Sequence, residues 1–161
     1  MNAALMNLAE RIRQELREID RIAQRAQTTW RQLRLTPDDA YLDSTALNLH
    51  GVYEGLERLF SLISLTVDKK RLHGSDWHQE LLTQMQSDVP GIRPAVISAE
   101  SGRALDKLRG FRHVVRHVYT FNYDPQQIGE LMANVTPVFE RVRSELLAFA
   151  DFLEQAAQDE R

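Results

Sequence analysis

The apolar residues of this chain recur at intervals of three and four, and this periodicity restricts the fold more than any other feature. Near the start of the chain the spacing runs through Leu8, Ile12, Leu16, Ile19 and Ile22, with charged residues in many of the gaps. Steps of three and four place side chains on one face of an α-helix, whereas a half-buried strand needs strict alternation. No convincing alternating segment occurs. The sequence therefore predicts an all-α protein, with a first helix over about residues 3–33.

Prolines and capping residues mark where other helices begin. Thr36 is expected to cap the second helix, with Pro37 at its first position, where the backbone N–H that proline lacks is not needed. Asp124 and Pro125 form the same kind of pair before the last helix. Pro137 differs from these prolines because it falls inside the last helical pattern, where we expect a kink.

Two shorter features lie between these helices. A third helix is expected to begin after Ser75 or Asp76, and residues 88–98, with two prolines and a glycine, are expected to form a loop. The fourth helix covers about residues 98–120. Five helices joined mostly by short turns favour a single antiparallel helical bundle. Since neither a repeat nor an interdomain linker is visible, we expect residues 1–161 to form one domain.

Composition excludes several classes of function. The 161 residues contain no cysteine, which excludes disulfides, thiol catalysis and cysteine-ligated zinc. A net charge of −3 argues against a bulk binder of nucleic acid. No apolar run approaches the roughly 20 residues that cross a bilayer, and the N-terminal residues become charged too early for a secretory signal. We therefore expect a cytoplasmic protein without a membrane segment.

Positive charge is nevertheless concentrated in residues 103–117. This segment holds five Lys or Arg residues and two histidines against one acid. A solvated helix face has the same composition, so the charge alone does not define a site. If RNA binds here, Arg109 and Arg116 are candidate contacts for its phosphates.

The most reactive side chains of this segment fall on different faces of the expected helix. Arg112 and Tyr119 are seven residues apart and share a stripe, whereas Arg112 and His117 differ by about 140°. Arg112 and His117 can converge on one phosphate in three ways: through their long side chains, through a local distortion of the helix, or through a second copy of the helix packed alongside. A symmetric dimer supplies the second copy and brings two arginines and two histidines into one cleft.

An arginine and a histidine are sufficient for RNA cleavage without a metal. Guanidinium binds phosphate and offsets the charge of the transition state. Imidazole titrates near neutrality and can move the proton of a ribose 2′-hydroxyl. Two alternatives remain open from the residues alone: an ordinary amphipathic helix edge, or metal binding by His113 and His117 one turn apart. No HExxH pattern and no nearby converging carboxylate supports the metal.

The second helix also carries polar residues among apolar ones. These are His50, Tyr53, Glu54 and Glu57. Polar groups at the edge of a core are the ordinary interpretation, and a supporting role for Tyr53 or Glu54 at the Arg112 site is the alternative.

The stretch LRGFRHVVRHVYTFNYD resembles the signature of HEPN-domain ribonuclease toxins, specifically the HepT-like group. The general HEPN pattern is R-x(4–6)-H with a polar residue directly after the arginine, which corresponds to Arg112, His113 and His117. The HepT form, R-x4-H-x-Y, is completed by Tyr119. The similarity extends over roughly residues 40–155.

This resemblance implies a fold, an activity and a partner. HEPN toxins are α-helical homodimers whose motifs meet at the interface in one metal-independent ribonuclease cleft, with no cofactor. Arg112 and His117 would be catalytic, with His113 in support and tRNA or mRNA as substrate. HepT-like toxins pair with an MntA-type nucleotidyltransferase antitoxin that transfers AMP from ATP to the motif tyrosine, here Tyr119. HEPN domains also occur as non-catalytic modules that bind a nucleotidyltransferase or a nucleotide, which is the alternative function.

Overall fold

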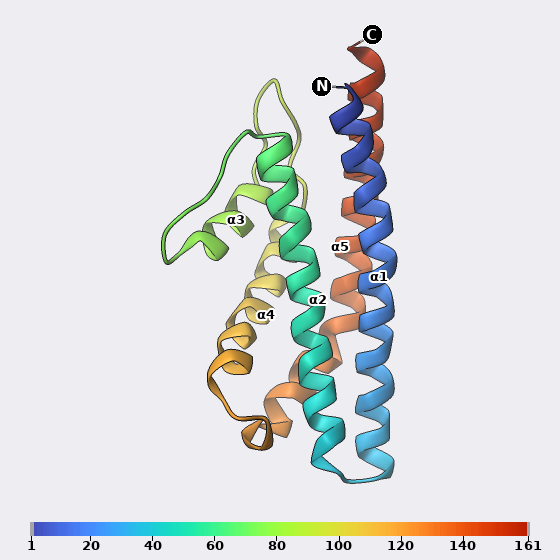
Figure 1. The fold of residues 1–161 in the computed structure, drawn as a ribbon, viewed down its shortest axis with the longest axis vertical. Helices are drawn as coiled ribbons and strands as arrows, with labels where there is room; N and C mark the ends of the chain where they lie inside the picture. The colour runs from blue at the N-terminus through green and yellow to red at the C-terminus, as the bar shows by residue number, and fades with distance from the viewer. Residues whose placement is uncertain (1, 161) are drawn as a thin grey trace.

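The protein is an all-α helical bundle, as the periodicity predicts. The computed structural model describes residues 2–160, apart from the side chain of Phe121. Figure 1 shows the elements in order, and their bounds are α1 Asn2–Leu35, α2 Asp39–Thr66, α3 Trp77–Met85, α4 Ala99–His117, the 3₁₀ helix η1 Thr120–Asn122, and α5 Pro125–Asp159. Within residues 2–160 no strand forms, and one isolated bridge joins Val89 to Arg93. None of these helices combines the length and apolar character that a bilayer crossing requires.

The helix α1 packs along α2 and α5 through the apolar stripe seen in the sequence. Leu8, Ile12, Leu16 and Ile19 are all buried. Gly55 of α2 allows a close approach to α1, because a Cβ atom built there would lie 2.6 Å from Ile19 Cγ1. At this position the packing of α1 on α2 requires a residue without a side chain.

Two helix starts test the capping predictions. The cap of α2 is Asp38 rather than Thr36: the Asp38 carboxylate accepts a hydrogen bond of 2.9 Å from Ala40 N. Thr36 is occupied elsewhere, since its N–H donates to Gln32 O at 2.8 Å and extends the end of α1. A carboxylate also suits the positive end of the helix dipole. The prediction for α5 is confirmed, because Asp124 accepts from Gln126 N at 3.0 Å.

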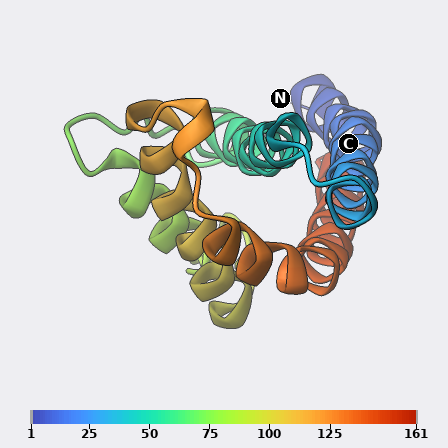
Figure 2. The ribbon, with the colours of Figure 1, turned by 90° about the horizontal axis from the view of Figure 1, so that it is seen from below.

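The helix α5 changes direction along its length. Figures 1 and 2 show its first part, in orange, crossing the bundle, while the later part, in red, runs beside α1. Pro137 lies inside α5 and has no N–H to continue the helical hydrogen bonds. The bend agrees with the expected kink, and it makes the two parts of α5 face different neighbours.

A buried ion pair fixes the loop that leads into α4. Arg93 and Asp68 form two hydrogen bonds, of 2.6 Å from Nε to Oδ1 and 2.7 Å from Nη2 to Oδ2. Arg93 also donates to the carbonyl oxygen of Ser87 at 2.9 Å. Ser98 then caps α4 by accepting from Ser101 N at 3.1 Å. The start of α4 is thus held by a fully hydrogen-bonded anchor.

The far end of α4 rests on a second, smaller core. Its buried members are Ala26, Leu42, Ala46, Leu49, Phe111, Tyr123, Ile128, Met132 and Val135. These residues come from α1, α2, α4, α5 and the segment before α5. Because Phe111 is among them, the turn of α4 that carries Arg112 is held against the bundle, and Val114, Val115 and Val118 beyond it are partly buried against the same core.

Candidate active site at the end of α4

The predicted site residues lie in the last two turns of α4 and just after it. Arg112 is half-buried, and its Nε atom is buried without a hydrogen-bond partner among the described residues. His113 and His117 are exposed. Within the described chain, residues 2–160, Arg112 and His117 are not joined by a hydrogen bond.

The two histidines form a pair on the surface. Their rings stack, with centroids 4.1 Å apart and planes inclined by 22°. His117 Nδ1 lies 2.9 Å from the carbonyl oxygen of His113. Since a carbonyl oxygen can only accept, this contact assigns the Nδ1 proton to His117 and leaves Nε2 of the neutral ring as a proton acceptor.

Tyr119 does not lie on the helix, which corrects the prediction that it shares a stripe with Arg112. The helix ends at His117, and Val118 is extended, with φ −106° and ψ 134°. Tyr119 then precedes η1, and Asn122 N donates to its carbonyl oxygen at 2.9 Å. The β-branched Val118 has a low helix propensity. The turn into η1 therefore begins before the end of the helical pattern in the sequence. As a result the Tyr119 side chain is 76% exposed.

The arginines of α4 face polar residues of α2. Burial lowers the pKa of His50, and the positive charges of Arg112 and Arg116 act in the same direction, while Glu54 opposes them. His50 Nε2 lies 3.5 Å from Glu54 Oε1, and His50 Nδ1 is buried with no hydrogen-bond partner among the described residues. His50 is therefore a neutral imidazole beside two cations.

A second series of polar contacts lies further along α2. Glu57 is buried, lies 2.7 Å from His78 Nδ1 of α3, and accepts a hydrogen bond from Tyr53. Burial raises the pKa of Tyr53, and the Glu57 charge raises it further. Arg109 and Arg112 oppose this shift. The sequence indicated Tyr53 and Glu54 as candidates for a supporting role, but it did not indicate the contact between Glu57 and His78. The only feature of the sequence that could have drawn attention to His78 is its place next to Trp77 in an amphipathic turn.

The two arginines predicted to contact RNA differ in their surroundings. Arg109 is ion-paired with Asp106, with 2.7 Å between Nε and Oδ1. Arg116 is exposed and makes no ion pair within residues 2–160. Arg116 is thus the more available of the two for an anionic ligand.

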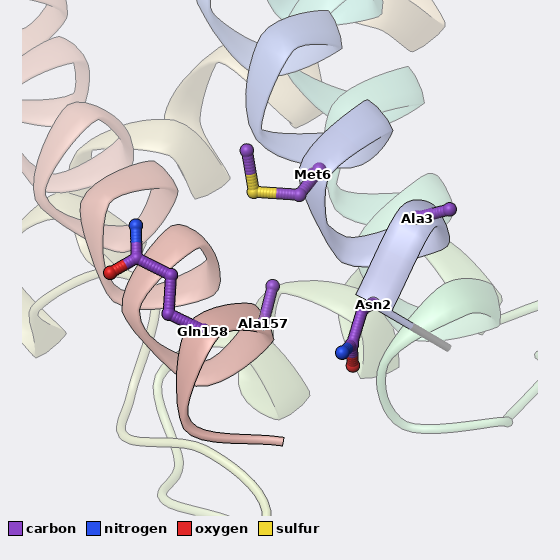
Figure 3. A pocket seen from close by; sticks show the side chains of 5 residues that line it. All are labelled: Asn2, Ala3, Met6, Ala157 and Gln158. Carbon is purple, nitrogen blue, oxygen red and sulfur yellow. The ribbon is translucent and has the colours of Figure 1, made fainter. Parts of the chain in front are cut away.

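Other parts of the described chain lack comparable chemistry. No three His, Asp or Glu side chains converge among the described residues in a way that could hold a metal ion. A hollow of about 590 Å³ lies between the ends of α1 and α5. Figure 3 shows the residues that line it: Asn2, Ala3, Met6, Ala157 and Gln158. None of these side chains titrates, and the hollow lies at the opposite end of α1 from the turn into α2.

The bundle, with Arg112, His117 and Tyr119 at the end of α4, has the features of a HEPN-type helical protein. The chain belongs to the HepT-like protein family, whose profile matches residues 44–153. The match covers about two thirds of the chain and includes α3, α4 and the motif segment. Neither a curated protein nor a solved structure matches the chain significantly.

Proposed function

We propose that this protein is the endoribonuclease toxin of a toxin–antitoxin pair and that it cleaves RNA without a metal. The observation that supports the proposal is that no hydrogen bond joins Arg112 to His117 among the described residues, which fits two halves of a composite site. Arg112 faces α2 with an unpartnered Nε, and the histidine pair is exposed at the end of the same helix. Membership of the HepT-like family supports the same activity. The two halves become one site when α4 of a second copy packs alongside.

In this site, His117 would move the proton and Arg112 would hold the phosphate. The ribose 2′-oxygen attacks the neighbouring phosphorus and the bond to the 5′-oxygen breaks. The 2′-hydroxyl proton goes to a base, for which Nε2 of neutral His117 is suited, and the departing 5′-oxygen takes up a proton from water. The products are a 2′,3′-cyclic phosphate and a 5′-hydroxyl, so DNA is not a substrate. His113 supports the reaction by fixing the His117 ring.

The neutral state of His50 fits this role for Arg112. A protonated imidazole beside Arg112 would add a second positive charge in the same half-buried space. Because burial and the two arginines lower the pKa of His50, the guanidinium of Arg112 remains the main fixed charge for a phosphate. Glu54 and Tyr53 support the site as part of its wall on α2.

Tyr119 would be the switch that turns the enzyme off. Its phenol is 76% exposed, whereas Tyr53 and Tyr123 are 1% and 8% exposed. In AMP transfer the phenolic oxygen attacks the α-phosphorus of ATP, pyrophosphate leaves, and the phenolic proton is lost to a base of the MntA-type antitoxin. The added phosphate and nucleoside would bring bulk and negative charge just beyond the end of α4, where they would compete with RNA for its arginines.

The activity test compares four preparations with RNA in the presence of a chelator. Wild type should release 2′,3′-cyclic phosphate ends, and Arg112→Ala and His117→Ala should not. His73→Ala is the matched control, because His73 is an exposed loop histidine outside the site. Equal cleavage by all preparations, or none by wild type freed of AMP, would contradict the proposal. In the second case the chain is a non-catalytic module that binds a nucleotidyltransferase or nucleotide.

The switch test uses intact mass after incubation with the partner nucleotidyltransferase and ATP. Wild type should gain one or more AMP units, and Tyr119→Phe should gain none. Tyr123→Phe is the control, because Tyr123 follows Tyr119 closely but is buried. If Tyr119→Phe gains the same mass as wild type, Tyr119 is not the acceptor.

A further inference from the structure

A large groove lies between α4 and the first part of α5. Its volume is about 1060 Å³. Arg103 and Lys107 line it from α4, and Gln127 and Asn134 line it from α5. The apolar side chains of Leu131 and Val138 contribute to its floor. The groove thus combines cations, side-chain amides and an apolar surface, none of which takes part in the site described above.

The groove leads along α4 toward His117. Arg103, Gly110 and His117 are spaced seven residues apart, so they follow one stripe of the helix with a drift of about 20° per step. Each step of seven residues advances about 10 Å along the helix axis. A chain molecule bound at His117 would therefore reach Gly110 and then Arg103 by extending along the groove.

The charges of the groove are distributed unevenly. Arg103 and Lys107 form no ion pair within residues 2–160. Arg141, on the α5 wall, is neutralised by Glu100 at 2.9 Å. Glu130 also lies on the α5 wall. The available positive charge is therefore on the α4 wall, on the same helix as Arg116 and the histidine pair.

We infer that this groove binds the part of a single-stranded RNA that flanks the scissile phosphate. Arg103 and Lys107 contact its phosphates, unstacked bases lie on the apolar floor, and the amides of Gln127 and Asn134 meet base edges. Base edges are accessible in this way only when the strand is unpaired. The inference rests on the proposed ribonuclease function. It adds that the substrate extends along this groove and that it is single-stranded there.

Gly110 provides a way to fill the groove without disturbing the bundle. A Cβ atom built on Gly110 meets no atom within 4 Å, and the residue is exposed in the middle of α4. Glycine is a poor helix former, so a larger residue there favours the helix. Gly110→Phe should block the groove, and Gly110→Ala is the matched control that changes helix propensity alone.

The experiment measures RNA binding and cleavage separately, in the presence of chelator. Binding is followed by fluorescence anisotropy with a labelled oligouridylate of about 12 nucleotides, which 2′-O-methylation makes uncleavable. Arg103→Gln/Lys107→Gln should bind about tenfold more weakly than wild type. The slope of log affinity against log salt should fall by about 0.7 per lost phosphate contact. Arg17→Gln/Lys70→Gln removes the same charge outside the groove and should bind as wild type.

Cleavage of a dinucleotide supplies the complementary measurement. Its rate should be unchanged in Arg103→Gln/Lys107→Gln and in Gly110→Phe, because a dinucleotide does not extend into the groove. If both variants still bind the long oligonucleotide as wild type does, the inference is overturned. It is also overturned if the Arg17→Gln/Lys70→Gln control loses as much affinity for this oligonucleotide as the groove variants. If only binding of a protein partner is lost, the groove is a peptide site and the inference is wrong. If wild type binds RNA through the groove but does not cleave it, the proposed ribonuclease function is contradicted, while the inference that the groove binds RNA is supported.

Discussion

The α1–α2 contact around Gly55 and the part of α4 from Gly110 to His117 are packed differently. The first is called the scaffold side below, and the second the motif side. On the scaffold side, α1 and α2 pack so closely that Gly55 has no room for a methyl group, and a Cβ there would lie 2.6 Å from Ile19 Cγ1. On the motif side, Gly110 of α4 faces open space. Glycine is needed at the first position for packing, whereas the fold does not need it at the second.

This difference separates stability from function in the molecule. The Arg93 anchor holds the loop that leads into α4, while the end of α4 carries the exposed side chains of His113, Arg116 and His117. Binding and catalysis commonly use exposed residues that a rigid scaffold positions. We therefore expect substitutions in the α1–α2 contact and at the Arg93 anchor to lower stability, and substitutions of Arg112 and His117 to change RNA cleavage.

The largest loss of stability is expected for Arg93→Met. Removing the guanidinium leaves the Asp68 carboxylate buried without its partner, and its side chain is only 5% exposed. We expect the free energy of unfolding to fall by about 3–5 kcal/mol, measured by urea denaturation. Arg71→Met is the control, because Arg71 is exposed. A loss no greater than that of Arg71→Met would show that the anchor does not hold the loop before α4.

A smaller loss is expected for Gly55→Ala on the scaffold side. The added methyl group must displace Ile19 from the α1–α2 contact, at a cost of about 1–3 kcal/mol. Urea denaturation measures the change, and Gly51→Ala is a useful comparison, since a Cβ there would lie 3.3 Å from Ile22 Cγ2. If Gly55→Ala is as stable as wild type, the packing at this position is looser than the structure indicates.

On the motif side the corresponding change, Gly110→Ala, should stabilise the protein. The methyl group meets no neighbour, and alanine favours the helix over glycine by about 0.5–1 kcal/mol. The unfolding midpoint in urea should rise with an unchanged slope. Opposite signs for Gly55→Ala and Gly110→Ala would support the contrast between the two sides, and equal signs would remove it.

The smallest effect is a pH dependence of stability from His50. Its pKa is lowered in the folded state by burial first, and then by Arg112 and Arg116 against the opposing charges of Glu54 and Glu57. Below about pH 6.5 the unfolded chain takes up a proton at His50 before the folded chain does. Stability should therefore fall as the pH drops through this range.

His50→Gln should remove this part of the pH dependence. The free energy of unfolding is measured between pH 7.5 and 5.5 for wild type, His50→Gln and the exposed control His73→Gln. The slope should flatten only in His50→Gln. A slope that is unchanged in His50→Gln would mean that His50 binds its proton equally well in both states.

The sequence predicted the helices better than their ends. Apolar periodicity identified α1 and α5 because their buried stripes are long, and Asp124 and Pro125 located the start of α5. The periodicity could not show that α4 ends at His117. That end depends on η1 and on Tyr123, which is packed in the smaller core with residues distant in sequence. The cap of α2 was also missed, because Thr36 takes part in the last turn of α1.

The sequence proposed the residues of the candidate site but could not show their surroundings. The motif spacing indicated Arg112 and His117, and the helical angle between them indicated that they do not meet on one helix. The position of His50 beside Arg112 depends on how α2 packs on α4. The groove along α4 depends on the course of α5: Pro137 predicted a bend in this helix, but no local pattern shows that its first part packs beside α4.

The central claim is that Arg112 of one chain works with His117 of another. It is tested most directly by co-expressing Arg112→Ala and His117→Ala with different affinity tags and purifying the mixed dimer through both tags. In this dimer one chain keeps the arginine and the other keeps the histidine. We predict that the mixed dimer cleaves RNA in chelator at a measurable fraction of the wild-type rate, while each variant alone does not. A mixed dimer that stays inactive beside active wild type would contradict the claim.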